Sequence, residues 1–268
     1  MSRLCVLVLL MAIGAVAVDA QTVEPADSRG EPSVQMLPRF DFRVSMEHLF
    51  SDETRYAWDA NFGGDIDLVA FGPSRVAFVA NYQTILGSEF RAFDPNQGNY
   101  TLDGAIVTRV AAMELAGVFH HVSRHLSDRP KRRPVDWNMV GARIQGSGGD
   151  DRIEYHARAD VRGVIQHTFV DYRWELDAEV GARVQVLPRM SLMATGAWRM
   201  LGVDDSQGRD TQHGVRAEGG VRLAGRDATL DLFVAAEQRV DPYQLEFSTV
   251  RWLTAGFRIS SPRPSRVP

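Results

Sequence analysis

Residues 152–162 read RIEYHARADVR, and residues 172–186 read YRWELDAEVGARVQV. In both stretches charged and apolar residues alternate one by one. Successive side chains of a β-strand point to opposite faces, so each stretch predicts a strand with one charged and one apolar face. Each stretch is also long enough for a tilted strand to cross the hydrocarbon core of a bilayer. The pattern therefore predicts strands of a transmembrane β-barrel.

The amino terminus has the features of a secretory signal peptide. Arg3 supplies the positive charge, residues 4–18 form the apolar segment, and small residues at 18–20 predict cleavage before Gln21. The single cysteine, Cys5, lies in this segment, which excludes a disulfide-stabilised secreted scaffold. We expect a signal peptide (1–20), a periplasmic lead-in (21–36), an outer-membrane β-barrel (37–260) and a periplasmic C-terminal tail (261–268).

The rest of the chain excludes two further classes. No second apolar run approaches the length of a transmembrane helix, so a helical membrane protein is excluded. The formal net charge is −4 and the charges are scattered, so nucleic acid is not expected as a partner. The expected partners are outer-membrane lipids, lipopolysaccharide and the barrel-assembly machinery, and the expected location is the bacterial outer membrane.

About twelve alternating segments follow residue 36, joined by connections of alternating length. The predicted fold is all-β, a transmembrane antiparallel up-and-down β-barrel of about 12 strands with both termini on the periplasmic side. Short turns are expected near 72–74, 111–113, 146–150, 187–189 and 224–227, and longer loops near 51–56, 87–99, 124–136, 163–171, 203–211 and 238–246. A soluble β-sandwich or lipocalin-like barrel also alternates. Long segments, aromatic residues near the segment ends and a polar face poor in lysine favour a membrane barrel over these soluble folds.

The charged face of the two opening stretches is expected to line the barrel lumen. Isolated charges there would be costly, so they must pair or meet water. Paired charges predict a filled or narrow interior and a structural or narrow-channel role, whereas the other interpretation is a hydrophilic channel. The mixture of signs argues against a strongly ion-selective pore. The expected lumen charges are Arg152, Glu154, Arg158, Asp160, Arg162, Arg173, Glu175, Asp177, Glu179 and Arg183.

One hairpin, residues 119–138, carries residues suited to catalysis. His121 and Ser123 fall in the apolar phase of one predicted strand, and Asn138 falls in the apolar phase of the next. They can therefore lie together on the lipid-facing side, at the outer-leaflet end of the hairpin. A histidine beside a serine can act as its base, and an amide can orient the imidazole. Asp136 has the same phase and is an alternative orienting residue.

This hairpin resembles the outer membrane phospholipase A family, a twelve-stranded barrel with His-x-Ser on one strand and Trp-Asn on the next. The resemblance implies Ser123 as nucleophile, His121 as base and Asn138 as orienting residue. It also implies calcium and dimerisation. The family follows its serine with Asn-Gly, which shapes the oxyanion and calcium sites, whereas Arg124 and His125 follow here. Lipid A deacylase barrels likewise use His-x-Ser with a downstream carboxylate, which here is Asp136.

Two functions therefore stay open. The first is a barrel with a charged lumen and no assigned substrate. The second is a calcium-dependent serine lipid hydrolase of phospholipase or lipid A deacylase type. A third interpretation makes the histidines an interfacial cluster, with His120 inward, His125 in the loop and basic residues 129–133 contacting anionic head groups. No metal site is expected, because adjacent histidines of a strand face opposite ways.

Overall fold

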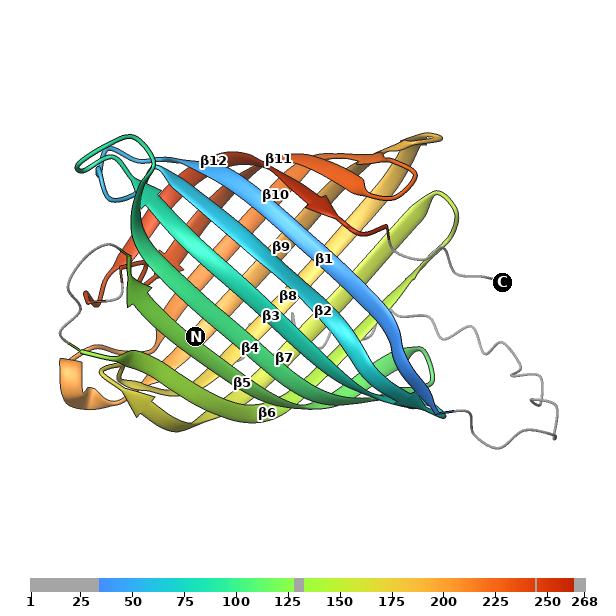
Figure 1. The fold of residues 1–268 in the computed structure, drawn as a ribbon, viewed down its shortest axis with the longest axis horizontal. Helices are drawn as coiled ribbons and strands as arrows, with labels where there is room; N and C mark the ends of the chain where they lie inside the picture. Colours follow the sequence, from blue (N-terminus) through green and yellow to red (C-terminus); the bar gives the residue numbers. More distant parts are fainter. Residues whose placement is uncertain (1–33, 128–132, 244, 263–268) are drawn as a thin grey trace.

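The structure is a computed structural model that describes residues 34–127, 133–243 and 245–262. The expected signal peptide, nearly all of the lead-in and most of the C-terminal tail lie outside the described residues. Twelve antiparallel strands close into one barrel in which each strand pairs with its neighbours in sequence, and β1 pairs with β12 (Figure 1). The strands are β1 Gln35–Phe50, β2 Trp58–Phe71, β3 Ser74–Gly87, β4 Asp94–Val110, β5 Met113–Leu126, β6 Val135–Gly149, β7 Ile153–Thr168, β8 Tyr172–Leu187, β9 Met190–Val203, β10 Gln212–Ala224, β11 Thr229–Val240 and β12 Thr249–Ser260.

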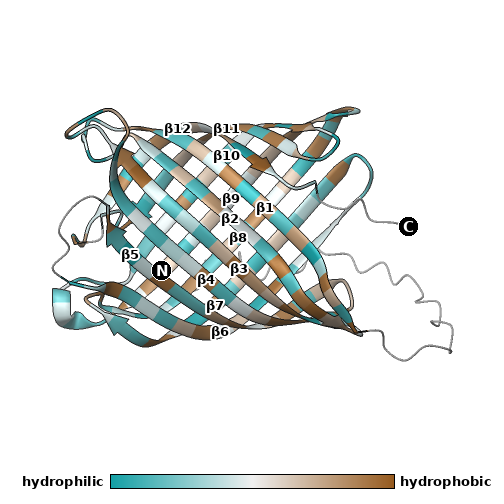
Figure 2. Cartoon of the chain, in the orientation of Figure 1, coloured by the Kyte–Doolittle hydropathy of each residue, from teal (hydrophilic) through white to brown (hydrophobic). Residues whose placement is uncertain are grey.

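The alternation of the sequence becomes an apolar outside and a charged inside. Along each strand hydrophobic and hydrophilic residues alternate in turn (Figure 2). Ile106, Val234 and Leu253 face outward and are more than 60% exposed, whereas the inward Asp160 and Asp231 are almost completely buried. A soluble barrel has the reverse distribution, so the predicted membrane barrel is confirmed in its strand number, topology and polarity.

Among the described residues, no helix is long and apolar enough to cross a membrane. One short 3₁₀ helix, η1 (Asp205–Gln207), lies in the loop between β9 and β10. Its first residues are capped by the side chain of Asp204, which accepts a hydrogen bond from the Ser206 amide at 2.9 Å. Five short turns lie at one end of the barrel and the longer loops lie at the other.

Several strands run further than the alternation predicts at the long-loop end. The expected loop 163–171 is in fact β7 up to Thr168, and β4 begins at Asp94 inside the expected loop 87–99. β5 extends to Leu126, and β6 begins at Val135, inside the expected loop 124–136. At the short-turn end, β6 also runs through most of the expected turn at 146–150, to Gly149. The reason is physical, because backbone pairing continues beyond the region in which the side chains alternate cleanly.

The seam between the first and last strands is shorter than the ladder on the other side of β1. β1 pairs with β12 from Arg43 to Phe50, but with β2 from Gln35 to His48. Beyond Ser260 one backbone hydrogen bond, from the Ser261 amide to the Phe42 carbonyl at 3.1 Å, continues the contact. The first residues of β1 therefore extend past the end of β12.

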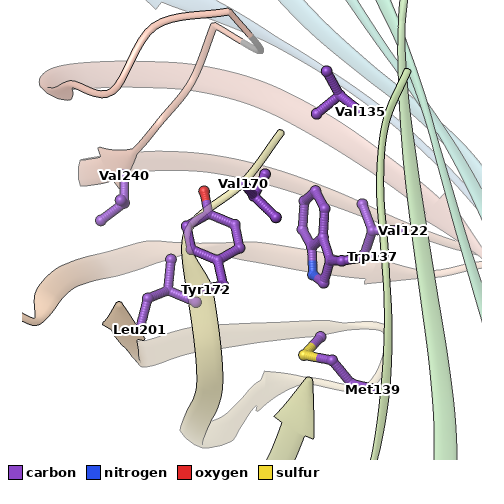
Figure 3. Packing of buried hydrophobic residues seen from close by; sticks show 8 residues of the cluster. All are labelled: Val122, Val135, Trp137, Met139, Val170, Tyr172, Leu201 and Val240. Carbon is purple, nitrogen blue, oxygen red and sulfur yellow. The ribbon is translucent and has the colours of Figure 1, made fainter. Parts of the chain in front are cut away.

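The hydrophobic core lies inside the barrel near the long-loop end. Inward side chains of β5, β6, β8, β9 and β11 pack there with Val170 (Figure 3). The edge of the Trp137 ring meets the Tyr172 ring, with centroids 5.2 Å apart. The members are Val122, Val135, Trp137, Met139, Val170, Tyr172, Leu201 and Val240. A second cluster of Leu49, Tyr56, Ile85 and Trp252 packs on the wall formed by β1, β3 and β12.

The connection between β11 and β12 folds across this end of the barrel, and we call its residues 241–243 and 245–248 the lid loop. Asp241 is its anchor, with both carboxylate oxygens bonded to Arg209 at 2.9 Å and one accepting the Tyr172 hydroxyl at 2.6 Å. Its carbonyl accepts Arg124 of β5 at 2.6 Å. β5 lies halfway round the barrel from β11, so the lid loop spans the mouth.

Candidate functional site

The hairpin of β5 and β6 places the predicted catalytic residues on the outward face. His121 and Ser123 follow the outward Phe119 along β5, and Asn138 precedes the outward Val140 on β6. In the antiparallel register His121 lies opposite Asn138, and Ser123 lies opposite Asp136. The structure therefore brings the four sequence-predicted residues together near the long-loop end of the apolar surface.

His121 and Asn138 form a direct hydrogen bond, with His121 Nδ1 2.7 Å from Asn138 Oδ1. The amide NH₂ of Asn138 in turn donates to the side-chain oxygen of Gln166 on β7. Because that assignment makes the Asn138 oxygen the acceptor, His121 carries its proton on Nδ1 when neutral. The Nε2 of His121 is then the atom that can accept a proton.

The hydroxyl of Ser123 bonds a second histidine. Ser123 Oγ lies 2.8 Å from Nε2 of His125, two residues further along the same face. The edge of the His125 ring rests on Tyr100 of β4, with centroids 5.4 Å apart, and Tyr100 is the register partner of Ser123. The expectation that His125 lies in the loop is wrong, because β5 continues to Leu126. The serine therefore has a histidine on either side along one strand face.

Asp136 is held by residues of β7 that the sequence reasoning did not find. One carboxylate oxygen accepts the side-chain amide of Gln166 at 3.2 Å, and the other accepts the Thr168 hydroxyl at 2.9 Å. The register between β6 and β7 shifts between Asn138 and Met139, which reverses the facing of β7 beyond Val164. Simple alternation therefore gave no signal for Gln166 and Thr168.

The residues around Ser123 do not suit a calcium ion. Asp136 is the carboxylate on this face, and both of its oxygens already accept protein hydrogen bonds. Calcium takes six or more oxygen ligands, usually including carboxylates. In the described part of the chain, no group of three or more His, Cys, Asp or Glu residues is placed to hold a metal ion. No step is therefore assigned to calcium.

Inside the barrel the charges of β7 and β8 form a connected set of ion pairs. Asp160 accepts Arg143 at 2.7 Å and Arg158 at 2.6 Å. Arg162 bonds Glu175 at 2.5 Å and also bonds Asp177. Each buried charge thus has an opposite charge and hydrogen bonds, the condition under which charges are tolerated in a desolvated interior.

The remaining predicted lumen charges divide into two groups. Glu154 pairs with Arg183 at 2.5 Å, and Glu179 contacts His156 at 3.2 Å, all on the inner face. Two assignments were wrong. Arg152 lies in the turn before β7, where the strand has not begun, and Arg173 lies at a bulge of β8 and pairs with Asp204 of a long loop at 3.3 Å.

A second network fills the opposite wall of the lumen. Arg216 of β10 bonds Glu47, Glu218 and Glu237, all within 3.0 Å. Arg239 of β11 joins Glu237 to Asp59 of β2, each at 2.7 Å. Both arginines and their carboxylates come from the inward phase of their strands, but Arg239 falls in the expected loop 238–246 because β11 continues to Val240.

The loops at the mouth hold their own charged groups. Arg209 bonds both Asp171 and Asp241, and although burial lowers the pKa of its guanidinium, these hydrogen bonds raise it well above its usual range. Burial raises the pKa of the Tyr56 hydroxyl in the first loop. Arg209 therefore stays charged at every relevant pH and holds the lid loop electrostatically.

No protein-family model and no curated protein matches this sequence. Solved structures are similar in fold. The outer membrane phospholipase A of Escherichia coli has a TM-score of 0.53 with 11% identity, over 86% of this chain and 99% of that chain. The Salmonella typhi enzyme, solved as a dimer with bound calcium, has a TM-score of 0.52 with 10% identity, over 88% of this chain and 94% of that chain. An active-site mutant of the E. coli phospholipase, with an asparagine changed to alanine, has a TM-score of 0.52 with 10% identity, over 90% of this chain and 95% of that chain. At these identities the likeness concerns the fold.

Proposed function

We propose that this barrel lies in the bacterial outer membrane, with its long loops outside and its short turns in the periplasm. The support is the apolar outward surface, which would be costly to expose to water. The fold shared with outer membrane phospholipase A agrees with that placement. In this orientation Ser123 and His121 lie at the outer-leaflet edge of the apolar surface, within reach of lipid ester groups.

The function that the geometry supports best is hydrolysis of lipid esters by Ser123. The observation that carries it is the His121–Asn138 hydrogen bond of 2.7 Å next to a serine, at the edge of the apolar outward surface. An oriented imidazole beside a hydroxyl is the arrangement that activates a serine nucleophile. The outer membrane phospholipase has an asparagine in its active site, which matches the role proposed for Asn138.

The proposed chemistry follows from these positions. Ser123 Oγ attacks the ester carbonyl carbon while His121 Nε2 takes the hydroxyl proton, and the proton then passes to the leaving alcohol. Oδ1 of Asn138 accepts a hydrogen bond from the Nδ1–H of His121 and so holds the imidazole in the required tautomer. A water molecule then releases the fatty acid by the same route. In the resting arrangement the Ser123 hydroxyl bonds His125, so it must first rotate about its Cα–Cβ bond toward His121.

The test compares the refolded protein with Ser123→Ala on phospholipid and on lipid A in mixed micelles, with and without calcium. We expect release of fatty acid that falls by roughly a thousandfold or more in the variant. Ser45→Ala, an inward serine of β1 away from the hairpin, is the matched control and keeps full activity. Heat-modifiable gel mobility verifies that every variant is folded. Equal turnover in wild type and Ser123→Ala would exclude Ser123 as the nucleophile.

A second candidate function is a closed structural barrel with no turnover, and the lumen favours it. Paired charges fill the centre, and the lid loop and the apolar cluster cover the outer mouth. Such an interior disfavours an open channel. Absence of hydrolysis from folded protein on both lipid classes would leave this second candidate.

A further inference from the structure

Four outward side chains on β5, β6 and β7 form one continuous chain of hydrogen bonds. Asp136 accepts the side-chain amide of Gln166 at 3.2 Å, and the carbonyl of that amide accepts Asn138. The side-chain carbonyl of Asn138 in turn lies 2.7 Å from Nδ1 of His121. Two amides therefore connect a carboxylate to the imidazole beside Ser123.

The chain has a direction, and Asp136 sets it. An ionised carboxylate only accepts hydrogen bonds, whereas the two ends of an amide have nearly the same shape and opposite roles. Gln166 must therefore turn its NH₂ group toward Asp136 and its oxygen toward Asn138. Asn138 must then turn its own NH₂ group toward Gln166 and its oxygen toward His121. This places the proton of the neutral imidazole on Nδ1.

An irregularity of β7 brings Gln166 into this chain. Asn138 pairs with Gln166, but the next residue of β6 pairs with Val164, so Ile165 is the extra residue of a bulge. With regular pairing Ile165 would lie opposite Asn138, and an isoleucine side chain can neither donate nor accept a hydrogen bond. The bulge therefore places a polar side chain where it can join Asn138 to Asp136.

The charge at one end of the chain acts on the imidazole at the other end. Hydrogen bonds in a chain polarise one another, and each is electrostatically stronger where water is excluded. The carboxylate therefore favours the positive charge that His121 acquires when it takes the proton of Ser123. Without it, either amide could reverse, and His121 would populate the tautomer with the proton on Nε2, which cannot act as the base.

We propose that Gln166 and Asp136 are positioning residues that fix the tautomer of His121 through Asn138. Asn138 and Asp136 then act in series and are not alternatives to each other. The effect on the rate rests on the proposed hydrolysis by Ser123. The tautomer is a property of the resting protein and can be measured without any substrate.

The tautomer is measured by nitrogen NMR of the full refolded chain, with isotope-labelled histidine, in detergent micelles at alkaline pH, where imidazoles are neutral. The signals that disappear in His121→Gln identify His121. We expect the wild type to carry the proton on Nδ1. Gln166→Leu and Asp136→Asn should each give a mixture of the two tautomers, because each change removes the fixed direction of the chain.

Two further variants separate the chain from general effects of substitution. Gln238→Leu makes the same change in another outward glutamine, which bridges β10 and β12 away from the hairpin. Thr168→Val removes the other side-chain hydrogen bond of Asp136 and leaves Gln166 in place. Both variants should keep the wild-type tautomer.

The rate of lipid hydrolysis gives a second readout. By analogy with the partners that orient metal-binding histidines, Gln166→Leu should lower kcat by about tenfold and leave KM nearly unchanged. The double variant Gln166→Leu/Asp136→Asn should be no slower than the slower single variant, because either change already breaks the chain.

The proposal is overturned if the wild type lacks the Nδ1 proton, or if either Gln166→Leu or Asp136→Asn keeps the wild-type tautomer. It is also overturned if Thr168→Val alters the tautomer as much as they do, or if Gln166→Leu leaves kcat unchanged in an active protein. A wild type without hydrolysis, in which both variants still shift the tautomer, would exclude the proposed function and support the positioning role.

Discussion

At the scale of single residues, Ser123 lies between two histidines that differ in their surroundings. His121 is fixed by Asn138, which defines its tautomer, whereas His125 already bonds the serine hydroxyl and rests on Tyr100. A base needs both a free acceptor nitrogen and a fixed orientation. In the proposed mechanism, the contact with His125 holds the Ser123 hydroxyl away from His121, and the contact with Asn138 orients His121 as the base.

This difference predicts opposite outcomes for two alanine substitutions. His121→Ala should reduce lipid hydrolysis about as much as Ser123→Ala. Substitutions within one catalytic unit have non-additive effects on the rate, because removing any one member disables the unit. His125→Ala should keep most of the activity, because it removes a competing hydrogen bond and frees the hydroxyl to rotate. The measurement is initial-rate fatty-acid release for each variant in parallel. A large loss in His125→Ala with activity retained in His121→Ala would assign the base to His125.

Asp150, in the turn between β6 and β7, predicts a dependence of stability on pH. Its carboxylate accepts the backbone N–H groups of Ile153 and Arg152, both at 2.8 Å, and these hydrogen bonds lower its pKa. A lowered pKa in the folded state gives stability that is present above the unfolded pKa and lost as pH falls through the folded pKa. We expect wild type to be more stable than Asp150→Asn at pH 7.

The measurement is urea unfolding of both proteins, followed by gel mobility, at neutral and at strongly acidic pH. The difference between wild type and Asp150→Asn should shrink in acid, where the wild-type carboxyl is also neutral. Asp227→Asn, an exposed carboxylate in another short turn, is the control and should show no such change. A difference that persists unchanged in acid would contradict the assignment to charge.

At the scale of elements, the strands were predictable because their side chains alternate with a period of two. Phase alone placed His121 and Asn138 on the outward face of neighbouring strands and assigned Asp160 and Asp177 to the lumen. It failed where pairing is irregular, since the bulge of β8 turned Arg173 toward a loop and the shift in β7 hid Gln166. A bulge depends on local backbone geometry that a residue pattern does not encode.

The lid loop is an element that the pattern could not reveal, because its contacts join residues far apart in the chain. Asp241 is buried and has a left-handed backbone, with φ of 47°. Removing one partner of a buried ion pair costs about 3–5 kcal/mol. Asp241→Ala should therefore remove the bonds of Asp241 to Arg209 and Tyr172, leave Arg209 bonded to Asp171, and loosen the lid loop.

We expect the wild type to be nearly non-conducting in a planar bilayer. Asp241→Ala should raise the single-channel conductance severalfold above it. Glu246→Ala removes a half-exposed carboxylate of the same loop that pairs with Arg55, and it should leave conductance unchanged. Equal conductance in all three proteins would show that the lid loop does not close the lumen.

At the scale of the whole molecule, the sequence predicted the polarity of the barrel but not how its ends are closed. Closure depends on which loop residues meet across the mouth and on how the apolar cluster packs beneath them. Gln97 of β4, for example, donates to the carbonyl of Pro242 at 3.1 Å, although the two residues are far apart in the chain. Such contacts are consequences of the tertiary fold, so they carry no local signature.

The short seam between β1 and β12 has a consequence for how the cylinder comes apart. The β1–β12 ladder runs only from Arg43 to Phe50, whereas β1 pairs with β2 from Gln35 to His48. A shorter ladder has fewer backbone hydrogen bonds to break. Every other junction joins strands that are consecutive in sequence, so a turn or loop ties the two partners together. The seam joins the first strand to the last and has no such tether. We therefore expect lateral strain to separate β1 from β12 before any other pair of neighbouring strands.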